Sequence, residues 1–276
     1  MNLAAQKIPD ENNSTTDDII RKISSGIENY EIITLEELKK SDANLMSRRE
    51  SKYLMTFEEC LNIISALSGD YRILDVEGCT VSGYETVYYD DNSFITYHQH
   101  HSGKLNRFKL RTRRYLSSGE SYVEIKEKKN TGVTIKKRIE TTESGILPKE
   151  EQDLFLKSNF PYDYHTFHPV LTTEYSRVTL VSKNYSERIT FDFGLTFSNT
   201  GDKISLPEVV IAEVKSGKNA SESKALSVMQ KYGVRKRSFS KYCIGVSLIY
   251  KNLKHNRFKP NLMYLSRISG GEALCC

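Results

Sequence analysis

Cations recur at every second position in the segment KLNRFKLRTRRYL, residues 104–116. Arg107, Lys109, Arg111 and Arg113 fall in one row, and apolar residues stand between the first three of them. A β-strand points successive side chains to opposite faces, so a strand here would place four cations on one face. Like charges at this spacing repel one another. The pattern therefore indicates a face that meets an anionic ligand.

Five further segments alternate in the same way. Their charged rows are Tyr122, Glu124, Lys126 and Lys128 in SYVEIKEKK; Lys136 and Arg138 in TIKKRIE; Tyr175 and Arg177 in TEYSRVTLV; Arg188 and Asp192 in ERITFDFGL; and Glu213 and Lys215 in VVIAEVKSG. For any single strand, a solvated face is the ordinary explanation. A solvated face normally mixes signs so that cross-strand pairs attract, whereas cations dominate these rows. A flat nucleic-acid platform usually adds stacking aromatic residues, and these rows contain few.

A sheet that curls into a barrel with its charged faces pointing inward explains the pattern better. Its apolar rows would pack outward against helices at 56–67 and 148–157. Like charges inside such a lumen are costly without counter-charge, so it would hold a long polyanion. Arginine offers bidentate forks to phosphate, and lysine acts as a point charge. Glu124 and Glu213 could then bind a hard divalent cation that bridges phosphates.

The elements that would position these residues are short strands and a few helices. Thr56 and Glu59 form a capping box before a helix whose apolar residues share one face. From about residue 71 the chain is rich in short β-type runs separated by Gly or Asn. About eight mostly meandering strands favour the α+β class with a large antiparallel sheet or barrel. We expect a disordered tail at 1–16, one domain at 17–255 and a C-terminal tail at 256–276.

The composition of the 276-residue chain is that of an ordinary globular domain, with 38% hydrophobic residues and a net charge of +5. No apolar run has the length of a membrane span, and the N-terminus lacks the apolar core of a signal peptide, so we expect a cytoplasmic protein. The terminal pair Cys275 and Cys276 could be a lipid acceptor or an exposed tail. His98, His100 and His101 could bind a metal, but a polar helical turn is the better interpretation because phosphate-bound metals prefer oxygen ligands.

An ordered set of motifs carries a family resemblance. RRESKY, YETVYYDD, RFKLRTRRY, YVEIKEKK, KKR, ERITFD, IAEVKSG and SFSKYCIG occur in this order between about residues 44 and 250. The set resembles the VTC domain, the polyphosphate polymerase domain of the vacuolar transporter chaperone family, which also occurs as a stand-alone bacterial domain. This family belongs to the triphosphate tunnel metalloenzymes, or CYTH-like superfamily. The resemblance implies an eight-stranded antiparallel β-barrel with a charged lumen and flanking helices.

The resemblance also implies an activity and its residues. The activity is transfer of the ATP γ-phosphate to a growing inorganic polyphosphate chain with Mn²⁺ or Mg²⁺, with a membrane protein as a possible partner and no nucleic acid. The expected catalytic residues are Lys52, Arg111, Arg113, Lys126, Arg177 and Arg188. The expected phosphate-binding residues are Lys109, Lys136, Arg138 and Lys241. Glu213 is the expected metal ligand. Glu124 is either a second metal group or a structural partner of Lys126 or Arg113.

Two departures from the family pattern matter for function. Ser238, next to Arg237, stands where catalytic eukaryotic members have a further lysine. Arg48, Glu50 and Lys52 replace the E-x-E-x-K motif of the hydrolytic branch, which favours the VTC branch. A tunnel-type triphosphatase that hydrolyses tripolyphosphate or a nucleoside triphosphate stays open as an alternative. So do a non-catalytic polyphosphate-binding module and an RNA-binding domain.

Overall fold

One large sheet organises the chain. The computed structural model describes residues 11–40, 49–142, 150–217 and 223–270. The strands are β1 (Glu31–Thr34), β2 (Arg49–Thr56), β3 (Tyr71–Asp75), β4 (Val81–Asp90), β5 (Arg107–Tyr115), β6 (Ser121–Lys128), β7 (Thr134–Thr141), β8 (His168–Ser182), β9 (Glu187–Ser198), β10 (Lys203–Leu206) and β11 (Val209–Ser216). The main path runs in the order β2-β11-β9-β8-β4-β5-β6-β7, with each neighbouring pair antiparallel.

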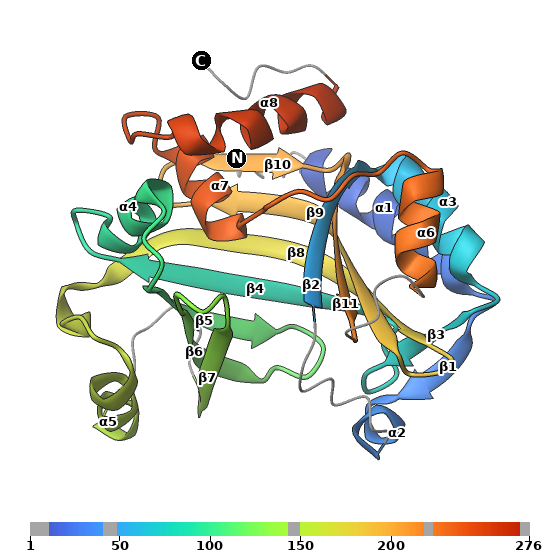
Figure 1. The fold of residues 1–276 in the computed structure, drawn as a ribbon, viewed down its shortest axis with the longest axis horizontal. Helices are drawn as coiled ribbons and strands as arrows, with labels where there is room; N and C mark the ends of the chain where they lie inside the picture. Colours follow the sequence, from blue (N-terminus) through green and yellow to red (C-terminus); the bar gives the residue numbers. More distant parts are fainter. Residues whose placement is uncertain (1–10, 41–48, 143–149, 218–222, 271–276) are drawn as a thin grey trace, which may run out of the picture.

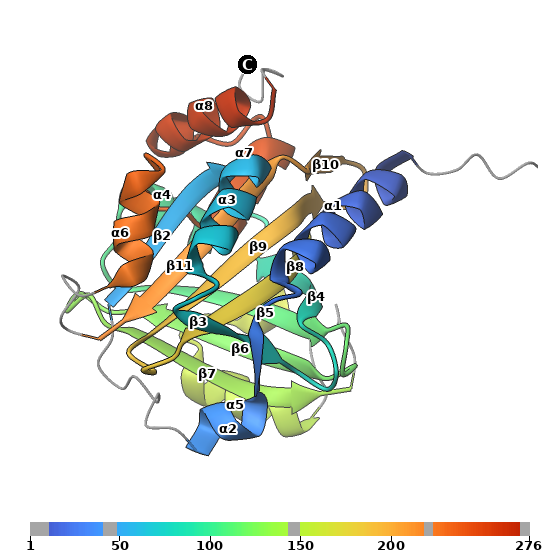
Figure 2. The same ribbon diagram turned by 90° about the vertical axis from the view of Figure 1, so that its right-hand side faces the viewer.

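Helices flank this sheet. They are α1 (Glu11–Ile27), α2 (Leu35–Lys40), α3 (Phe57–Leu67), α4 (Ile95–Ser102), α5 (Glu150–Asn159), α6 (Lys224–Lys231), α7 (Lys241–Ile249) and α8 (Lys259–Ile268), with short 3-10 turns at Tyr164–Thr166 and Asn256–Phe258. The predicted α+β class with an antiparallel sheet and flanking helices is confirmed. The sheet is strongly curved, and β5–β7 cross the direction of β8, β9 and β11 (Figures 1 and 2).

The sheet is open rather than closed into the predicted barrel. In the described ranges, β2 and β7 end the path and no ladder joins them. The charge pattern and the family resemblance both predicted closure, but inward-facing rows of side chains look the same in a curled open sheet and in a barrel. β1, β3 and β10 add short pairings off the main path.

The strand register confirms the predicted charged face. On neighbouring strands, Lys109 lies opposite Lys126, and Arg111 lies opposite Glu124. Glu124 in turn lies opposite Arg138 on β7. Across the rest of the sheet, Arg177 pairs with Asp192, Lys215 with Arg188, and Glu213 with Lys52. Residues that are directly opposite on adjacent strands share a face, so the rows merge into one charged surface.

Apolar residues of the opposite face pack beneath helices. α1, α3 and α6 cover β2, β8, β9 and β11 in one cluster that includes the fully buried Ile63, Ile189 and Phe191 (Figure 2). The predicted capping box begins α3. The Thr56 hydroxyl accepts from the Glu59 amide at 3.1 Å, and the Glu59 carboxylate accepts from the Thr56 amide at 2.8 Å. A second cluster joins α5 and residues 160–167 to β4–β6.

α7 covers one end of the charged face. The inward row of each strand changes from charged to apolar there: Lys52 gives way to Leu54, and Glu213 to Ile211, both of which pack in a cluster with α7. All residues from Tyr242 to Ile249 are buried. The helix lies across β8 and β9, and α8 lies outside it (Figure 1). Apolar side chains therefore bound the charged face at this end.

The structure places helices within both segments that were predicted as tails. α8 lies within the segment predicted as a C-terminal tail, and its Leu262 and Leu265 are buried in the α7 cluster. Pro260 stands in its first turn, where a missing amide proton costs nothing. At the other end, α1 begins at Glu11. The terminal cysteines lie outside the described residues.

Candidate phosphate-binding site on the inner face of the sheet

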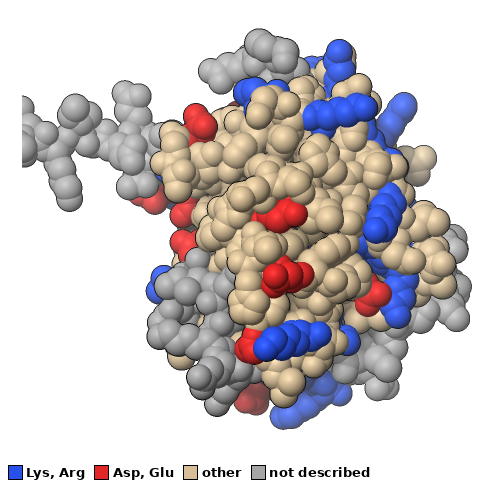
Figure 3. Space-filling model, turned by 90° about the vertical axis from the view of Figure 1, so that its left-hand side faces the viewer, with Lys and Arg blue, Asp and Glu red and all other residues tan. Residues whose placement is uncertain are grey.

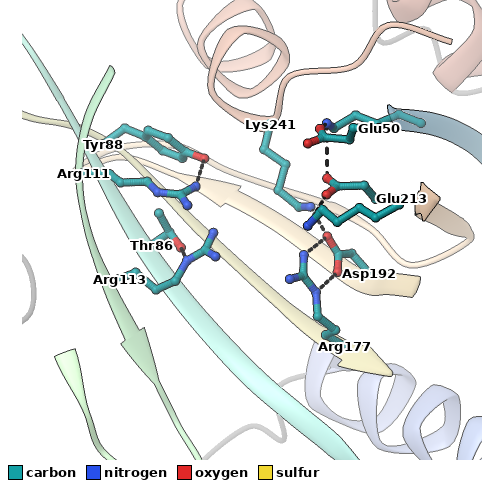
Figure 4. A network of polar contacts seen from close by, with 11 residues as sticks. Glu50, Thr86, Tyr88, Arg111, Arg113, Arg177, Asp192, Glu213 and Lys241 are labelled. Carbon is teal, nitrogen blue, oxygen red and sulfur yellow. Dashed lines mark hydrogen bonds and ion pairs between the residues drawn. The ribbon is translucent and has the colours of Figure 1, made fainter. Parts of the chain in front are cut away.

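Two groups of charged side chains face each other across the inner side of the sheet. The first, called here the cationic wall, comprises Lys109, Arg111, Arg113, Glu124, Lys126, Lys136 and Arg138 on β5–β7. The second, called the mixed wall, comprises Lys52, Arg177, Arg188, Asp192, Glu213 and Lys215 on β2, β8, β9 and β11. Arg111 and Arg113 point toward Arg177, Asp192 and Glu213 across the intervening space (Figure 4). We call this space the charged trough.

The charges of the two walls act on each other. The pKa of Lys126 on the cationic wall is affected by Lys52 and Glu213, although β2 and β11 begin the strand order and β6 stands near its end. The curl of the sheet thus brings its two ends together without a hydrogen-bonded seam. The predicted inward orientation of the charged rows is correct even though the barrel is not closed.

Glu124 is the electrostatic centre of the cationic wall. Its carboxylate accepts from Arg111 Nε at 2.8 Å, and Arg111 Nη2 lies 2.6 Å from the same oxygen. Lys136 forms an ion pair with its other oxygen. Only 1% of the Glu124 side chain is exposed. Burial alone would raise the pKa of this carboxyl, but Arg111, Arg113 and Lys136 hold it at about 2. Glu124 therefore acts as a counter-charge, and its ion-pair partners are Arg111 and Lys136 rather than the predicted Lys126 or Arg113.

Lys126 has a different environment from the rest of this wall. Among the described residues, no carboxylate forms an ion pair with it, and its register partners on both sides are the lysines 109 and 136. Burial, together with the charges of Lys52, Arg111 and Lys109, lowers the pKa of Lys126 to about 7 against the opposing effect of Glu213. A lysine held this way gains most from an added anion.

Arg113 and Lys109 are held by neutral groups. Arg113 is buried, donates from Nε to the Thr86 hydroxyl at 3.2 Å, and lies 5.5 Å from the ring of Tyr84. Lys109 donates to the hydroxyl of Ser240, the N-cap of α7, at 2.7 Å. Burial lowers the pKa of Lys109. In the described ranges, neither cation forms an ion pair with a carboxylate.

Asp192 organises the mixed wall. Arg177 reaches its carboxylate with two nitrogens, Nε at 2.5 Å and Nη2 at 2.8 Å, and Lys241 from α7 forms an ion pair with the same group. Burial would raise the pKa of Asp192, but Arg177 and Lys241 hold it at about 2. The guanidinium carbon of Arg177 also lies 5.1 Å and 5.5 Å from the ring centroids of Tyr84 and Tyr175, which stack on each other. This guanidinium is fixed before any ligand arrives.

Glu213 lies between two lysines on the same wall. Lys215 Nζ is 2.6 Å from one carboxylate oxygen and Lys52 Nζ is 3.2 Å from the other. Lys52 also contacts Glu50 (Figure 4). Although burial opposes ionisation, Lys215 and Lys52 hold the pKa of Glu213 below its usual range. The group is thus an ionised, partly exposed carboxylate beside a second one, as a hard metal ligand requires.

The other predicted site residues take peripheral positions. Arg188 lies on β9 opposite Lys215, next to Glu213 in the register. Arg138 is exposed and stacks 4.4 Å from the ring of Tyr122. Ser238 is exposed, and the neighbouring Arg237 lies 3.7 Å from the ring of Tyr264, on the outside of the trough's α7 end. Arg48 lies outside the described residues.

Sequence reasoning placed Asp192 on the charged face but missed its function. Asp192 joins Arg177 to Lys241, which comes from α7. No spacing in the sequence relates Lys241 to β9. The RITFD pattern, with an acid among inward-facing residues, was the available signal. The three histidines lie on or at the end of α4, as the polar helical turn predicted. In the described part of the chain, no cluster of three or more His, Cys, Asp or Glu residues could hold a metal by itself.

Comparison with known proteins identifies the family. The family model of the VTC domain matches residues 47–250. Among curated proteins, none matches the chain in sequence. Solved structures with a similar arrangement include the PH1012 protein from Pyrococcus horikoshii, with 17% identity, a TM-score of 0.41, and coverage of 71% of this chain and 98% of that chain.

Two further similar structures have the same extent. HpAC1 from Hippeastrum, described as having a dominant triphosphatase activity, has 13% identity and a TM-score of 0.44, and the match covers 72% of this chain and 94% of that chain. A Bacillus halodurans protein provisionally described as an adenylate cyclase has 14% identity and a TM-score of 0.47, over 71% and 96% of the two chains. These values are too low to support a shared activity.

No helix in the described segments is both long and apolar enough to cross a membrane. The family model covers most of the chain, including every strand of both walls. The protein therefore belongs to the VTC domain family.

Proposed function

We propose that this domain is a polyphosphate polymerase that transfers the γ-phosphate of ATP to the end of an inorganic polyphosphate chain. The observation that carries the proposal is the cationic wall, where Arg111, Arg113, Lys109 and Lys126 line one surface and Glu124 is the single acid of the group. Three of these cations have no carboxylate partner among the described residues. A linear chain of phosphates supplies the missing counter-charge along the whole wall.

The two walls would divide the reaction between them. An oxygen of the acceptor's terminal phosphate attacks the γ-phosphorus of ATP, the bond from that phosphorus to the β,γ-bridging oxygen breaks, and ADP leaves with the electron pair. The transition state spreads negative charge over the transferred phosphoryl oxygens, so positioning and electrostatic stabilisation dominate catalysis. Arg111 and Arg113 on one side and Arg177 on the other would hold the phosphates in line. No side-chain nucleophile is needed.

The carboxylates of the mixed wall fit a divalent metal. Magnesium and manganese in phosphoryl-transfer sites are usually held by one or two carboxylates together with phosphate oxygens rather than by a full protein cage. Glu213, ionised and 18% exposed, with Glu50 nearby across Lys52, matches this donor set. Such a metal would supply charge neutralisation between phosphate oxygens. Glu124 fits less well, because Arg111 and Lys136 already occupy both of its oxygens.

The proposal is tested with purified protein, ATP and Mn²⁺ or Mg²⁺. Products are separated on gels that resolve long polyphosphate chains, and free phosphate is measured in parallel. We expect metal-dependent chains from the wild type and none from Glu213→Gln, which removes the charge and keeps the shape. Glu127→Gln is the matched control, because Glu127 lies on the other face of β6 and its nearest cation is Lys129 at 4.0 Å. It should retain activity.

The alternatives predict other products. Free phosphate without chains, lost in Glu213→Gln, would identify a tunnel-type triphosphatase and contradict the polymerase. Tight metal-independent polyphosphate binding with neither product would identify a binding module. Preferred binding of single-stranded RNA would contradict both phosphate-transfer proposals.

A further inference from the structure

A second basic cavity lies outside the charged trough. It is a cleft of about 410 Å³ between α4, the β5–β6 and β6–β7 region, the start of α7 and the turn before α8, and we call it the rim cleft. Its cations are Arg107, Lys128, Lys129 and Arg257, and no Asp or Glu lines it. On the face of the molecule that includes α4 and α5, Lys and Arg side chains gather along one margin, while Asp and Glu lie nearer the middle (Figure 3).

The two arginines of the rim cleft, Arg107 and Arg257, are held by backbone carbonyls. Arg107 Nη1 donates to the carbonyl of Lys104 at 2.8 Å, and Arg257 Nη1 to the carbonyl of His101 at 3.3 Å. In the described ranges neither guanidinium forms an ion pair with a carboxylate. Burial lowers the pKa of Arg107, and the charge of Arg257 lowers it further. Two arginines that repel each other across a cavity indicate an anionic occupant.

The rim cleft continues the row of the cationic wall. Arg107 precedes Lys109 on the same face of β5, and Lys128 is its register partner on β6. Ser240, at the start of α7, lines the rim cleft, and its hydroxyl accepts a hydrogen bond from Lys109 of the cationic wall. A chain of phosphates that passes Lys109 would next meet Arg107 and Lys128.

The remaining lining favours phosphates over nucleotides. His100 is kept neutral: its Nδ1 lies 2.9 Å from Cys243 Sγ, and burial together with the charges of Lys109 and Arg107 lowers its pKa to about 2. The one other aromatic lining residue, Phe258, is 6% exposed and offers no free ring face. Single-stranded nucleic acids are usually bound with exposed aromatic rings on which bases stack. The cleft has charge without such a platform.

We infer that the rim cleft is a second polyphosphate-binding site, which holds the part of a long chain that extends past Lys109 and beyond the charged trough. The inference rests on the proposed function for the source of that chain. Binding of polyphosphate can nevertheless be measured without ATP, so the two proposals fail separately.

The test compares ligands of two lengths in equilibrium titrations without ATP or metal. Tripolyphosphate is short enough to occupy the trough alone, and long-chain polyphosphate reaches both cavities. The test variant is Arg107→Gln/Arg257→Gln, and the control is Lys203→Gln/Lys231→Gln, which removes the same charge from exposed positions on β10 and α6. We expect the test variant to bind long-chain polyphosphate about tenfold more weakly and with a smaller salt dependence, and to bind tripolyphosphate within about twofold of the wild type.

Four other binding outcomes would overturn the inference. Equal losses for both ligands would place the two arginines in the trough, and equal losses in the control would reduce the effect to net charge. Unchanged binding of the long chain would show that the cleft is not used. Tighter binding of a single-stranded RNA than of long-chain polyphosphate would make it a nucleic-acid surface. A wild type without polymerase activity but with the length-dependent loss keeps the cleft and refutes the proposed function.

Discussion

The cationic wall and the mixed wall carry similar side chains in opposite electrostatic states. On the mixed wall, Asp192 binds Arg177 and Lys241, and Glu213 binds Lys52 and Lys215, so nearly every charge has a partner. On the cationic wall, Glu124 neutralises Arg111 and Lys136, and the charges of Lys109, Arg113 and Lys126 are left over.

This difference separates two tasks of an anion site. Paired cations are held in fixed orientations and lose little freedom when a ligand arrives, which suits the alignment of reacting groups. Unpaired cations give up no existing ion pair when they bind phosphate, so they supply affinity. We therefore expect changes in the mixed wall to affect turnover first, and changes in the cationic wall to affect binding first.

The largest effect is expected for Arg177→Met. The change removes a bidentate partner from Asp192, whose side chain is 4% exposed, and leaves Lys241 as its single cation. Loss of one positioned donor for a developing charge typically lowers kcat by about 10²–10³. The free energy of unfolding should also fall, by about 2–3 kcal/mol, because a buried carboxylate loses half of its compensation.

Steady-state kinetics and urea unfolding measure both effects, and Arg177→Lys is the matched control. It keeps the charge and loses the bidentate geometry, so kcat should recover only in part. If Arg177→Lys and the wild type have equal kcat values, the fixed orientation of this guanidinium is irrelevant to turnover.

A smaller effect is expected for Glu124→Gln, which should strengthen polyphosphate binding rather than lower kcat. This change removes the carboxylate of the cationic wall and leaves Arg111 and Lys136 without a counter-charge, which should lower the free energy of unfolding by about 1–3 kcal/mol. The wall becomes more positive, so polyphosphate should bind more tightly than to the wild type. Calorimetric titration and urea unfolding test the pair of effects; weaker binding would place Glu124 among the metal ligands.

Lys126→Met should weaken polyphosphate binding and stabilise the ligand-free protein. The charged form of Lys126 is destabilised by burial and by neighbouring cations, so its removal should stabilise the ligand-free protein by about 1–2 kcal/mol after allowance for solvent screening. Polyphosphate binding should weaken about tenfold because a direct partner is lost. Thermal unfolding without polyphosphate measures the gain in stability, and thermal unfolding with polyphosphate measures the loss of binding. A ligand-free variant less stable than the wild type would contradict this account of the cationic wall.

The pH dependence follows from the same lysine. Folding lowers the pKa of Lys126 from 10.5 to about 7, so the unfolded chain binds more protons between these values, and this group destabilises the ligand-free fold most below pH 7. Bound phosphates favour the protonated form, so binding takes up a proton near neutral pH. Polyphosphate affinity should fall severalfold from pH 6.5 to 8. Lys126→Arg, which stays charged, should lose most of that dependence.

Much of the charged face follows from the sequence because strand alternation is a local property. The row Arg107, Lys109, Arg111 and Arg113 predicts its own face, and the register then aligns it with Glu124 and Lys126. The capping box at Thr56 is equally local. Family resemblance adds the order of the rows along the chain.

The parts that sequence reasoning missed depend on contacts between distant segments. Lys241 reaches Asp192 only because α7 packs across β8 and β9, and the position of α7 depends on the apolar contacts of its own cluster. The rim cleft combines residues from four separate segments. β2 was not predicted as a strand because its charged residues Arg49, Glu50 and Lys52 show no simple alternation, and it becomes one through pairing with β11. Whether the sheet closes likewise depends on contacts between β2 and β7, which end the strand order and are far apart in the sequence.

Gly245 in α7 fixes how near that helix stands to the sheet. A Cβ atom at this position would lie 2.6 Å from both Leu171 Cδ2 and Phe197 Cδ1, on β8 and β9. Any larger residue would therefore lift the helix away from the strands, together with Ser240 and Lys241 at its start. The absence of a single methyl group at this position therefore keeps Ser240 within reach of Lys109 and Lys241 within reach of Asp192.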